Sequence, residues 1–485
     1  MSVPLYKQYD NMPVQVRASF WFLICSILQK GISVITTPIF TRLLSTNEYG
    51  QFNVFTSWQA ILTVIVILYL PWGVYEQGVV KFEEQKKTFT SSLLGLDTTL
   101  VIVWTIIYLL SRGFWNRLFS LTTPQMLAML LMMWTSSGFC FWAIQQRTEY
   151  KYAKLVLLTL LTSVAKPVVG IIVVQTFADK VTARIIGLAV VELVMYGGVI
   201  ISQFIQGKVF FSIKIWKYAI WFNVLLIPHY LSQTVLNGAD RIMIKNMVGD
   251  SEAGIYSLAY SISLLMTIFN TAVLQTMGPW IFQRIKAKES DRIAKVSYPA
   301  LIGVAAVNLL LIAFAPEAVR IFAPVKYYSA IWVIPPVAMS VFFMFMYSLF
   351  ANFEFYYEKT KMISAATMIG ALLNLVLNYI FIKQYGYYAA GYTTLFCYVL
   401  YALMHYLFMA RILKNNEGGQ TVYSSKVLLG ISIAFVTAGF LLMMTYNLPI
   451  LRYSCIAFGF VVIILMRKRI LELLRTMVAM RTDKS

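Results

Sequence analysis

Two lysines stand in the middle of long apolar stretches. Lys30 lies near the centre of an apolar run over residues 18–40, and Lys166 near the centre of another over 155–178. A lysine at the centre of a membrane-spanning helix costs about 2.5–3.5 kcal/mol on insertion scales, so it faces a partner or a wet cavity. An ammonium group also binds phosphate. We therefore expect both lysines to line a cationic cavity that holds an anionic headgroup.

The surroundings of Lys166 leave an alternative open. Glu192 lies at a similar depth in the next apolar run, so the two residues could instead form a structural ion pair. Pro167 directly follows the lysine, disfavours helical geometry there and removes one backbone donor. A kink at this position would open the helix beside the charge.

Other ionisable residues in or near the apolar runs extend these hypotheses. Arg42 and Arg241 are candidates for the same anion-binding set. A carboxylate inside a membrane can bind a proton or Na⁺, and it can equally lock helices together. His229 follows Pro228 in an apolar run, and a hydrogen-bonded structural role is the simpler interpretation for it and for His405. The candidates for gating or ion coupling are Asp240, Glu192, Asp97 and His229.

No motif in the sequence indicates catalysis, a metal site or a cofactor. The two histidines are isolated, and the four cysteines fall in separate apolar runs without close spacing. The segment 386–394, GYYAAGYTT, lacks the lysine that a phosphate-binding loop carries after its second glycine. We therefore expect neither an ATP-driven pump nor a membrane enzyme.

The composition indicates that spanning helices carry these charged residues. The chain has 485 residues, 59% hydrophobic and 12% charged, whereas soluble domains are about 25% charged. Apolar runs that approach 20 residues predict an all-α polytopic membrane protein with about fourteen transmembrane helices. The predicted spans cover residues 18–40, 53–74, 91–111, 124–145, 155–178, 184–205, 217–237, 255–280, 298–323, 329–352, 362–383, 388–410, 426–446 and 449–466.

The distribution of basic residues predicts an orientation. The net charge of +20 does not indicate nucleic-acid binding, because Lys and Arg occupy alternate short loops rather than one patch. With a cytoplasmic N-terminus, 27 of the 40 basic residues fall on the cytoplasmic side and 11 on the opposite side. This bias favours two cytoplasmic termini. The first span shows no small-residue cleavage site, so we expect it to be retained.

A faint internal repeat divides the chain. The segment that begins at Gln29 returns 204 positions later, at the same place in the hydropathy pattern. It predicts two six-helix bundles, over 1–206 and 207–414, followed by two additional helices and a basic tail over 415–485. Ser45 and Glu48 fit a capping box at the start of the second span, and the repeated glycines would let helices approach closely. The repeated positions are Gln29, Glu48 and Gly50, and Gln233, Glu252 and Gly254.

The segment from Ser19 to Trp58, SFWFLICSILQKGISVITTPIFTRLLSTNEYGQFNVFTSW, resembles the opening of bacterial polysaccharide-biosynthesis flippases of the O-antigen (Wzx) type. Its most specific part is TPIFTRLLS-x-x-EYG. The pairs Asp240-Arg241 and Glu252-x-Gly254 are similar to the second half of such proteins. These flippases belong to the multidrug/oligosaccharidyl-lipid/polysaccharide exporter superfamily.

The resemblance implies a fold and a function. The two bundles would form a V around a central cavity and work by alternating access. They would move an undecaprenyl-diphosphate-linked oligosaccharide, such as an O-antigen unit for lipopolysaccharide, from the cytoplasmic to the periplasmic leaflet of the bacterial inner membrane. The resemblance also implies coupling to a proton (H⁺) or Na⁺ gradient, with membrane lipid and other polysaccharide-assembly membrane proteins as partners.

Three alternatives stay open. A cation-coupled multidrug exporter would have a cavity that attracts cations, which Lys30 and Lys166 oppose. A lipid II flippase of the same superfamily is a close variant of the main hypothesis. A polysaccharide polymerase or ligase would carry a large periplasmic loop, whereas no predicted loop exceeds about 20 residues.

Overall fold

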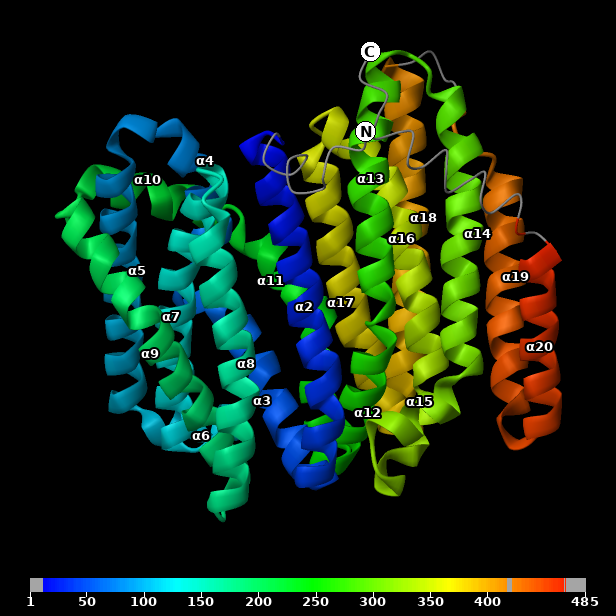
Figure 1. Cartoon of the computed structure of the whole chain (residues 1–485), viewed down its shortest axis with the longest axis horizontal. Coiled ribbons are helices and arrows are strands. Elements are labelled where there is room, and N and C mark those ends of the chain that lie inside the picture. Colours follow the sequence, from blue (N-terminus) through cyan, green and yellow to red (C-terminus); the bar gives the residue numbers. More distant parts are fainter. Residues whose placement is uncertain (1–11, 417–420, 466, 468–485) are drawn as a thin grey trace, which may run out of the picture. The chain divides into compact units, whose positions relative to one another are not determined.

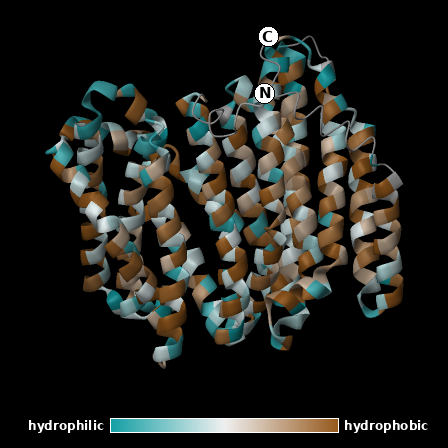
Figure 2. Ribbon diagram, viewed as in Figure 1, coloured by the Kyte–Doolittle hydropathy of each residue, from teal (hydrophilic) through white to brown (hydrophobic). Residues whose placement is uncertain are grey.

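The computed structural model describes residues 12–416, 421–465 and 467, and every regular element within them is a helix (Figure 1). The prediction of an all-α polytopic fold is therefore confirmed. The predicted basic tail beyond residue 467 and residues 1–11 lie outside the described residues. In Figure 2, hydrophobic residues run along most helices, and hydrophilic ones gather near helix ends.

The chain folds into two compact units, residues 1–238 and 239–485. The first unit begins with long helices that hold Lys30, Asp97, Lys166 and Glu192. Its elements are α2 (Val14–Leu43), α3 (Thr46–Val66), η1 (Leu70–Trp72), α4 (Val74–Lys81), η2 (Glu83–Gln85), α5 (Lys86–Leu110), α6 (Arg112–Phe119), α7 (Thr123–Thr148), α8 (Tyr152–Thr176), α9 (Lys180–Gly207), α10 (Ile213–Val224) and the first part of α11 (Ile227–Met247).

The second unit begins inside α11, at Ala239. Its further elements are α12 (Asp250–Ser263), α13 (Met266–Lys286), α14 (Asp291–Ala313), α15 (Ala315–Phe322), η3 (Val325–Trp332), α16 (Ile334–Tyr356), α17 (Thr360–Tyr385), α18 (Tyr388–Asn416), α19 (Ser425–Met444), η4 (Thr445–Asn447) and α20 (Pro449–Leu465).

Each predicted span corresponds to helical structure, although not all of the helices are equally long or apolar. Among the described residues, 11 helices are long and apolar enough to cross a membrane, and the bent pair α10 and α11 makes 12. The two other predicted positions hold α3, which is rich in polar residues, and α20, which has 17 residues. Helix α3 begins at Thr46 rather than near residue 53, because Ser45 caps it and its first turns are polar.

Proline acts differently at two of the predicted spans. The seventh span is broken, and its two helices, α10 and α11, meet at a bend of 52°. Pro228 lies in the first turn of α11, where the missing backbone N–H is tolerated. In contrast, α8 runs without a break through Pro167. A spanning helix can absorb one lost backbone hydrogen bond when neighbouring groups compensate.

Helix α10 is fixed to the first unit by buried hydrogen bonds. Asn223 is fully buried, accepts a hydrogen bond from the Val74 N–H at 2.8 Å and donates one to the Leu68 carbonyl at 2.7 Å. The Trp216 indole N–H donates to the Ser92 carbonyl at 2.9 Å. These hydrogen bonds explain why α10 belongs to the first unit. The division at residues 206 and 414 remains a prediction about the internal repeat.

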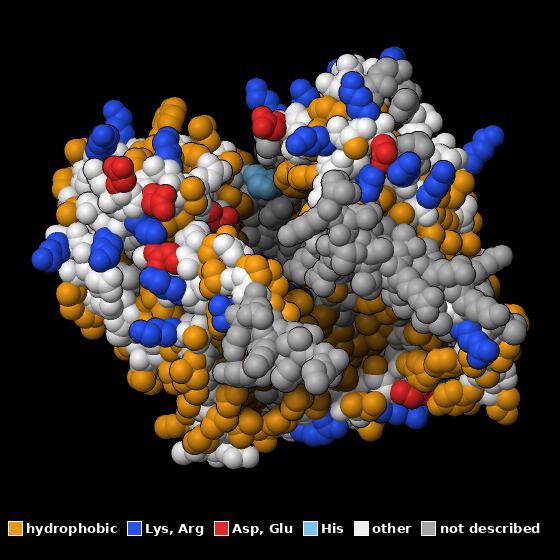
Figure 3. All heavy atoms as spheres, turned by 45° about the horizontal axis from the view of Figure 1, so that its top comes forward, with side chains coloured by type: hydrophobic (Ala, Val, Ile, Leu, Met, Phe, Trp, Pro, Cys, Tyr) orange, Lys and Arg blue, Asp and Glu red, His pale blue; other side chains and the backbone are white. Residues whose placement is uncertain are grey.

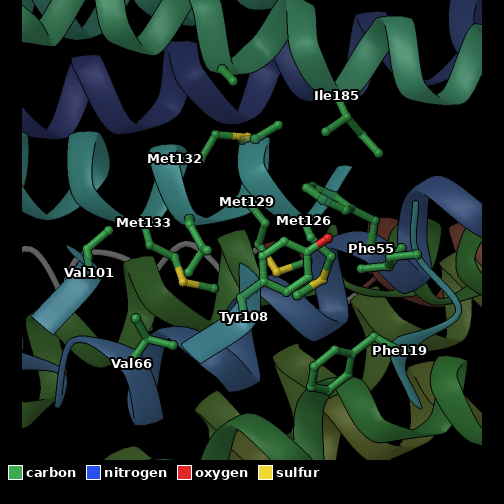
Figure 4. Close-up of a cluster of buried hydrophobic side chains, with 14 of the residues drawn as sticks. Phe55, Val66, Val101, Tyr108, Phe119, Met126, Met129, Met132, Met133 and Ile185 are labelled. Atoms are coloured by element: carbon green, nitrogen blue, oxygen red, sulfur yellow. The ribbon is translucent and has the colours of Figure 1, made fainter. Parts of the chain in front are cut away.

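The core of the first unit is a cluster of side chains from several helices, whereas the second unit is built around one central helix. In the first unit, methionines of α7 meet side chains of α3, α5 and α9 in one buried cluster (Figure 4). Methionine fills irregular gaps between helices well, because its side chain is unbranched and flexible. In the second unit, α16 is the central helix, since 83% of its spanning window is buried. A helix that is apolar all round is expected at such a central position.

Candidate functional site

Helices α2 and α8 lie side by side in the first unit and bring the two predicted lysines to one level. The Gln29 amide donates a hydrogen bond to the Ser163 hydroxyl at 3.3 Å. Lys30 directly follows Gln29, and Lys166 lies about one helical turn beyond Ser163. Both lysines are half-buried. The hydrogen bond therefore shows the register of α2 against α8, in which Lys30 and Lys166 lie near the middle of adjacent spanning helices.

Lys166 forms the ion pair that the sequence left open. Its Nζ lies 2.6 Å from Oε1 of Glu192, whose side chain is only 3% exposed. The other carboxylate oxygen accepts hydrogen bonds of 2.9 Å from the hydroxyls of Thr135 and Ser136 on α7. Glu192 thus ties α8 and α7 to α9, and it balances the charge of Lys166. By contrast, Lys30 has no hydrogen bond or ion pair among the described residues.

Ser137, which follows Ser136 on α7, binds a second buried carboxylate, that of Asp97. The Ser137 hydroxyl donates to Oδ1 of Asp97 at 2.8 Å, and Asp97 is completely buried. Its Oδ2 has no hydrogen-bond partner among the described residues. The run Thr135-Ser136-Ser137 therefore supplies hydroxyls to carboxylates on two different helices. Sequence reasoning missed this run, although three adjacent hydroxyls inside an apolar span were a visible signal.

The repeat motif of the first unit has a structural role at the end of α2. The predicted capping box is confirmed, since the Glu48 N–H donates to the Ser45 hydroxyl at 3.1 Å and the Ser45 N–H donates to the Glu48 carboxylate at 2.7 Å. Gly50 is buried in α3. The Arg184 guanidinium of α9 lies between the rings of Phe40 and Phe52, 3.5 and 3.6 Å from their centroids. This stacking joins α2, α3 and α9 at the motif.

Arg42 lies away from the two central lysines. It is exposed at the end of α2 and donates to the Pro38 carbonyl of its own helix at 2.9 Å. Twelve residues separate it from Lys30, which corresponds to about 18 Å along an α-helix. The structure therefore does not bring Arg42 into the group formed by Lys30 and Lys166.

In the second unit, Asp240 is the centre of a buried polar cluster. Its carboxylate accepts hydrogen bonds from Tyr256 OH at 2.6 Å, from the Asn378 amide at 2.6 Å and from the Thr394 hydroxyl at 3.0 Å. The donors come from α12, α17 and α18. Asp240 is 1% exposed. All three donors are neutral, so the cluster holds a carboxylate without an ion-pair partner among the described residues.

A second layer of oxygen atoms surrounds this carboxylate. The Asn378 amide also donates to Oδ1 of Asn374 at 3.1 Å, and its own carbonyl accepts a hydrogen bond from the Thr393 hydroxyl. The Asn374 amide nitrogen is buried without a partner among the described residues. Carboxylate, amide and hydroxyl oxygens are the ligands that hard cations prefer. The cluster can chemically accept either a proton on Asp240 or a small cation.

Three other residues singled out from the sequence, Arg241, Glu252 and Gly254, lie in α11 and α12 of the second unit. The Arg241 guanidinium lies over the Tyr260 ring, 4.6 Å from its centroid. Gly254 is buried in α12. Glu252 lies in the first turn of α12, after an N-cap glycine, Gly249, that makes no side-chain capping hydrogen bond. Tyr256 replaces the Phe52 of the first repeat, and its hydroxyl gives Asp240 a donor that phenylalanine cannot give.

The first-unit part of α11 holds His229 and Gln233. His229 is half-buried, and its Nδ1 has no hydrogen-bond partner among the described residues. The expectation of a hydrogen-bonded structural histidine is therefore wrong at that nitrogen. The Gln233 carbonyl accepts a hydrogen bond from the Asn237 amide at 2.9 Å.

The expectation of a hydrogen-bonded structural histidine is confirmed for His405. Its partner, Glu354, was not predicted from the sequence. Nδ1 of His405 lies 2.6 Å from Oε1 of Glu354, and both side chains are fully buried. The pair joins α18 to α16, and the Tyr347 and Tyr401 rings lie against the imidazole. Glu354 lies near the end of a predicted span, where a carboxylate can also be read as a loop residue.

Two protein-family models and a protein of known sequence match this chain. A family model described as "Polysaccharide biosynthesis protein" matches residues 16–285, and one described as "MatE" matches 226–380. A Haemophilus influenzae protein named "Uncharacterized membrane protein" is 21% identical over 382 residues, which cover 74% of this chain and 88% of the relative.

Solved structures of two kinds share the fold. The structure titled "Lipid II flippase MurJ, inward closed conformation" aligns with a TM-score of 0.68 at 16% identity, over 92% of this chain and 99% of the other. An inward-facing multidrug resistance MATE family transporter of the MOP superfamily aligns with a TM-score of 0.58 at 13% identity, over 80% of this chain and 96% of the other. Because the polysaccharide biosynthesis model covers more than half of the sequence, the chain belongs to that family.

Proposed function

We propose that the protein is a flippase for an undecaprenyl-diphosphate-linked oligosaccharide, such as an O-antigen or similar polysaccharide repeat unit. It moves this lipid from the cytoplasmic to the periplasmic leaflet of the bacterial inner membrane. Membership in the polysaccharide biosynthesis family supports the substrate class. The observation that carries the proposal is Lys30, a cation near the middle of a spanning helix, beside Lys166, with no ion-pair partner among the described residues.

The charge balance around Lys30 favours an anionic substrate. Glu192 balances Lys166, so Lys30 adds an uncompensated positive charge at the same level. A charge in surroundings of low dielectric constant interacts strongly with an opposite charge. A diphosphate provides that opposite charge, whereas a cationic drug would be repelled. This charge balance opposes the multidrug-exporter alternative.

In this proposal, Asp240 couples transport to a proton or sodium gradient. The support is that its carboxylate is buried, has only neutral hydrogen-bond donors and links three helices of the second unit. Binding a cation there changes the hydrogen bonds that hold α11 to α17 and α18. Such a change gives the ion a different affinity for two arrangements of the helices, which coupling requires.

The test is complementation of a strain that lacks its own O-antigen flippase, with surface polysaccharide as the readout. Wild type, Lys30→Ala, Lys30→Arg and Lys361→Ala are compared at equal membrane levels, where Lys361 is an exposed control. We expect the wild type, Lys30→Arg and Lys361→Ala to restore polysaccharide and Lys30→Ala to fail. Full restoration by Lys30→Ala would show that the central cation is not needed.

Ion coupling and the alternative substrates have their own readouts. Asp240→Asn is expected to abolish the dependence of transport on the ion gradient, because it removes the only charge of the hydrogen-bonded cluster. Rescue of cells depleted of their lipid II flippase, without rescue of polysaccharide export, would replace the proposed substrate by lipid II. Drug efflux without either rescue would favour the multidrug exporter.

A further inference from the structure

A cavity of about 930 Å³, with charged and amide side chains in its lining, opens at one end of the first unit, apart from the central lysines. It lies where α5 and α8 begin and where α7 and α9 end. Lys154 on its wall is twelve residues from Lys166, which corresponds to about 18 Å along α8. This end of the unit is the one for which the distribution of basic residues predicts a cytoplasmic location.

Positive charge dominates the lining of this cavity. Its charged residues are Lys86, Lys87, Lys151 and Lys154, against Glu149 alone. Nζ of Lys86 and of Lys151 lie 2.7 and 2.6 Å from the Glu149 carboxylate. Lys87 and Lys154 have no ion pair among the described residues and are exposed. In Figure 3, Lys and Arg side chains gather together with acidic ones on the forward face of this unit.

Glu149 keeps its negative charge over the physiological pH range. Burial raises the pKa of Glu149, but hydrogen bonds from Lys151, Lys86 and Gln145 outweigh this effect and lower the pKa to about 2. Glu149 therefore stays ionised and keeps Lys86 and Lys151 in place. Lys87 and Lys154 remain available for an anion.

The rest of the lining suits a ligand rich in hydroxyl groups. Gln203 is 6% exposed, and its amide nitrogen donates to the Gly138 carbonyl at 3.0 Å. Its Oε1 is buried without a hydrogen-bond partner among the described residues, so it can accept one from a ligand. Further amides, hydroxyls and aromatic rings complete the wall: Thr90, Trp142, Gln145, Gln146, Tyr150, Tyr152, Ser202 and Gln206.

We propose that this cavity binds the phosphate-bearing, hydroxyl-rich headgroup of a membrane lipid. Basic pockets between spanning helices on the cytoplasmic side bind anionic lipid headgroups, and about 300–1,000 Å³ is the usual volume of a small-ligand pocket. Lys87 and Lys154 bind the phosphate, and Gln203 accepts a hydrogen bond from a hydroxyl group. Two lipids carry this chemistry, phosphatidylglycerol and an undecaprenyl-diphosphate-linked sugar. The second source rests on the proposed function, whereas the headgroup site does not.

The test measures lipid binding to the purified full-length protein by native mass spectrometry. The probes are phosphatidylglycerol, undecaprenyl diphosphate and, as a zwitterionic control, phosphatidylcholine. Lys87→Gln/Lys154→Gln removes the two free charges. Lys214→Gln/Lys217→Gln is the matched control, because it removes two exposed lysines of α10 outside the cavity. Lys87→Arg/Lys154→Arg keeps the charge.

The expected result is selective loss of anionic-lipid binding. With about a fivefold effect for each lysine near a phosphate, the Lys87→Gln/Lys154→Gln variant should bind phosphatidylglycerol about 25-fold more weakly. The arginine variant and the α10 control should bind like the wild type. Equal binding by wild type and the glutamine variant, or an equal loss in the α10 control, would overturn the proposal.

Competition between the two anionic lipids identifies the source. If undecaprenyl diphosphate displaces phosphatidylglycerol from the wild type, and the glutamine variant loses both, the cavity receives the transported lipid. If only phosphatidylglycerol binding depends on Lys87 and Lys154, the site belongs to the bulk membrane lipid. The second result leaves the proposed flippase function untouched, since the complementation assay tests it separately.

Discussion

Removing Glu192 should destabilise the first unit more than removing Glu192 and Lys166 together. Glu192→Leu leaves the ammonium group of Lys166 without its 2.6 Å partner and two hydroxyls of α7 without their acceptor. Breaking a buried ion pair by removing one partner costs about 3–5 kcal/mol. The Lys166 side chain is 31% exposed, so we expect a loss in the free energy of unfolding near the lower limit, about 3 kcal/mol.

The double variant Lys166→Met/Glu192→Leu removes the stranded charge as well. Thr135 can still donate to the Leu131 and Met132 carbonyls of its own helix, at 3.1 and 3.2 Å. The double variant should therefore recover part of the lost stability, with a coupling energy of about 2 kcal/mol between the two sites.

Thermal unfolding of the purified protein in lipid nanodiscs measures this effect. For a unit of about 240 residues, 1 kcal/mol corresponds to about 2–4 °C in the midpoint, so Glu192→Leu should lower it by about 6–12 °C. Glu192→Gln, which keeps an acceptor for Thr135 and Ser136, should lose less than Glu192→Leu. If the effects of the two single substitutions simply add in the double variant, the ion pair does not stabilise the protein, and the reasoning is refuted.

Three further predictions concern the packing of helix ends. Asn223→Ala leaves the buried Val74 N–H and Leu68 carbonyl without partners and should cost about 2–3 kcal/mol of stability; an unchanged unfolding midpoint would contradict this. Gly207→Ala should destabilise, because a Cβ there would lie 2.3 Å from the Lys87 carbonyl oxygen, whereas Gly197→Ala in the same helix meets nothing within 4 Å and should stabilise by about 0.5–1 kcal/mol. The thermal unfolding midpoint of Gly207→Ala should therefore lie below that of the wild type, and the midpoint of Gly197→Ala above it. Arg452→Met should expose α20 to limited proteolysis, because Arg452 and Tyr453 both bind Glu317 of α15, and an unchanged digestion pattern would speak against it.

Local features were predictable from the sequence. The spans follow from runs of apolar residues, because a helix in lipid satisfies its backbone within the segment. The capping box at Ser45 depends on residues only three positions apart, so no tertiary contact is needed to form it. The Lys166–Glu192 pair was also accessible as an alternative, since the two residues lie at similar depths in consecutive spans.

Features that depend on how helices rotate and pack were decided only by the tertiary structure. Two of the three hydrogen-bond partners of Asp240, Asn378 and Thr394, lie 138 and 154 positions away, and asparagine and threonine carry no distinctive pattern in an apolar span. The stacking of Arg184 between Phe40 and Phe52 likewise joins separate helices, and the cavity that Lys87 and Lys154 line is formed by several helices. Hydropathy fixes the length and depth of a helix, but its face toward each neighbour depends on side-chain packing across the whole unit.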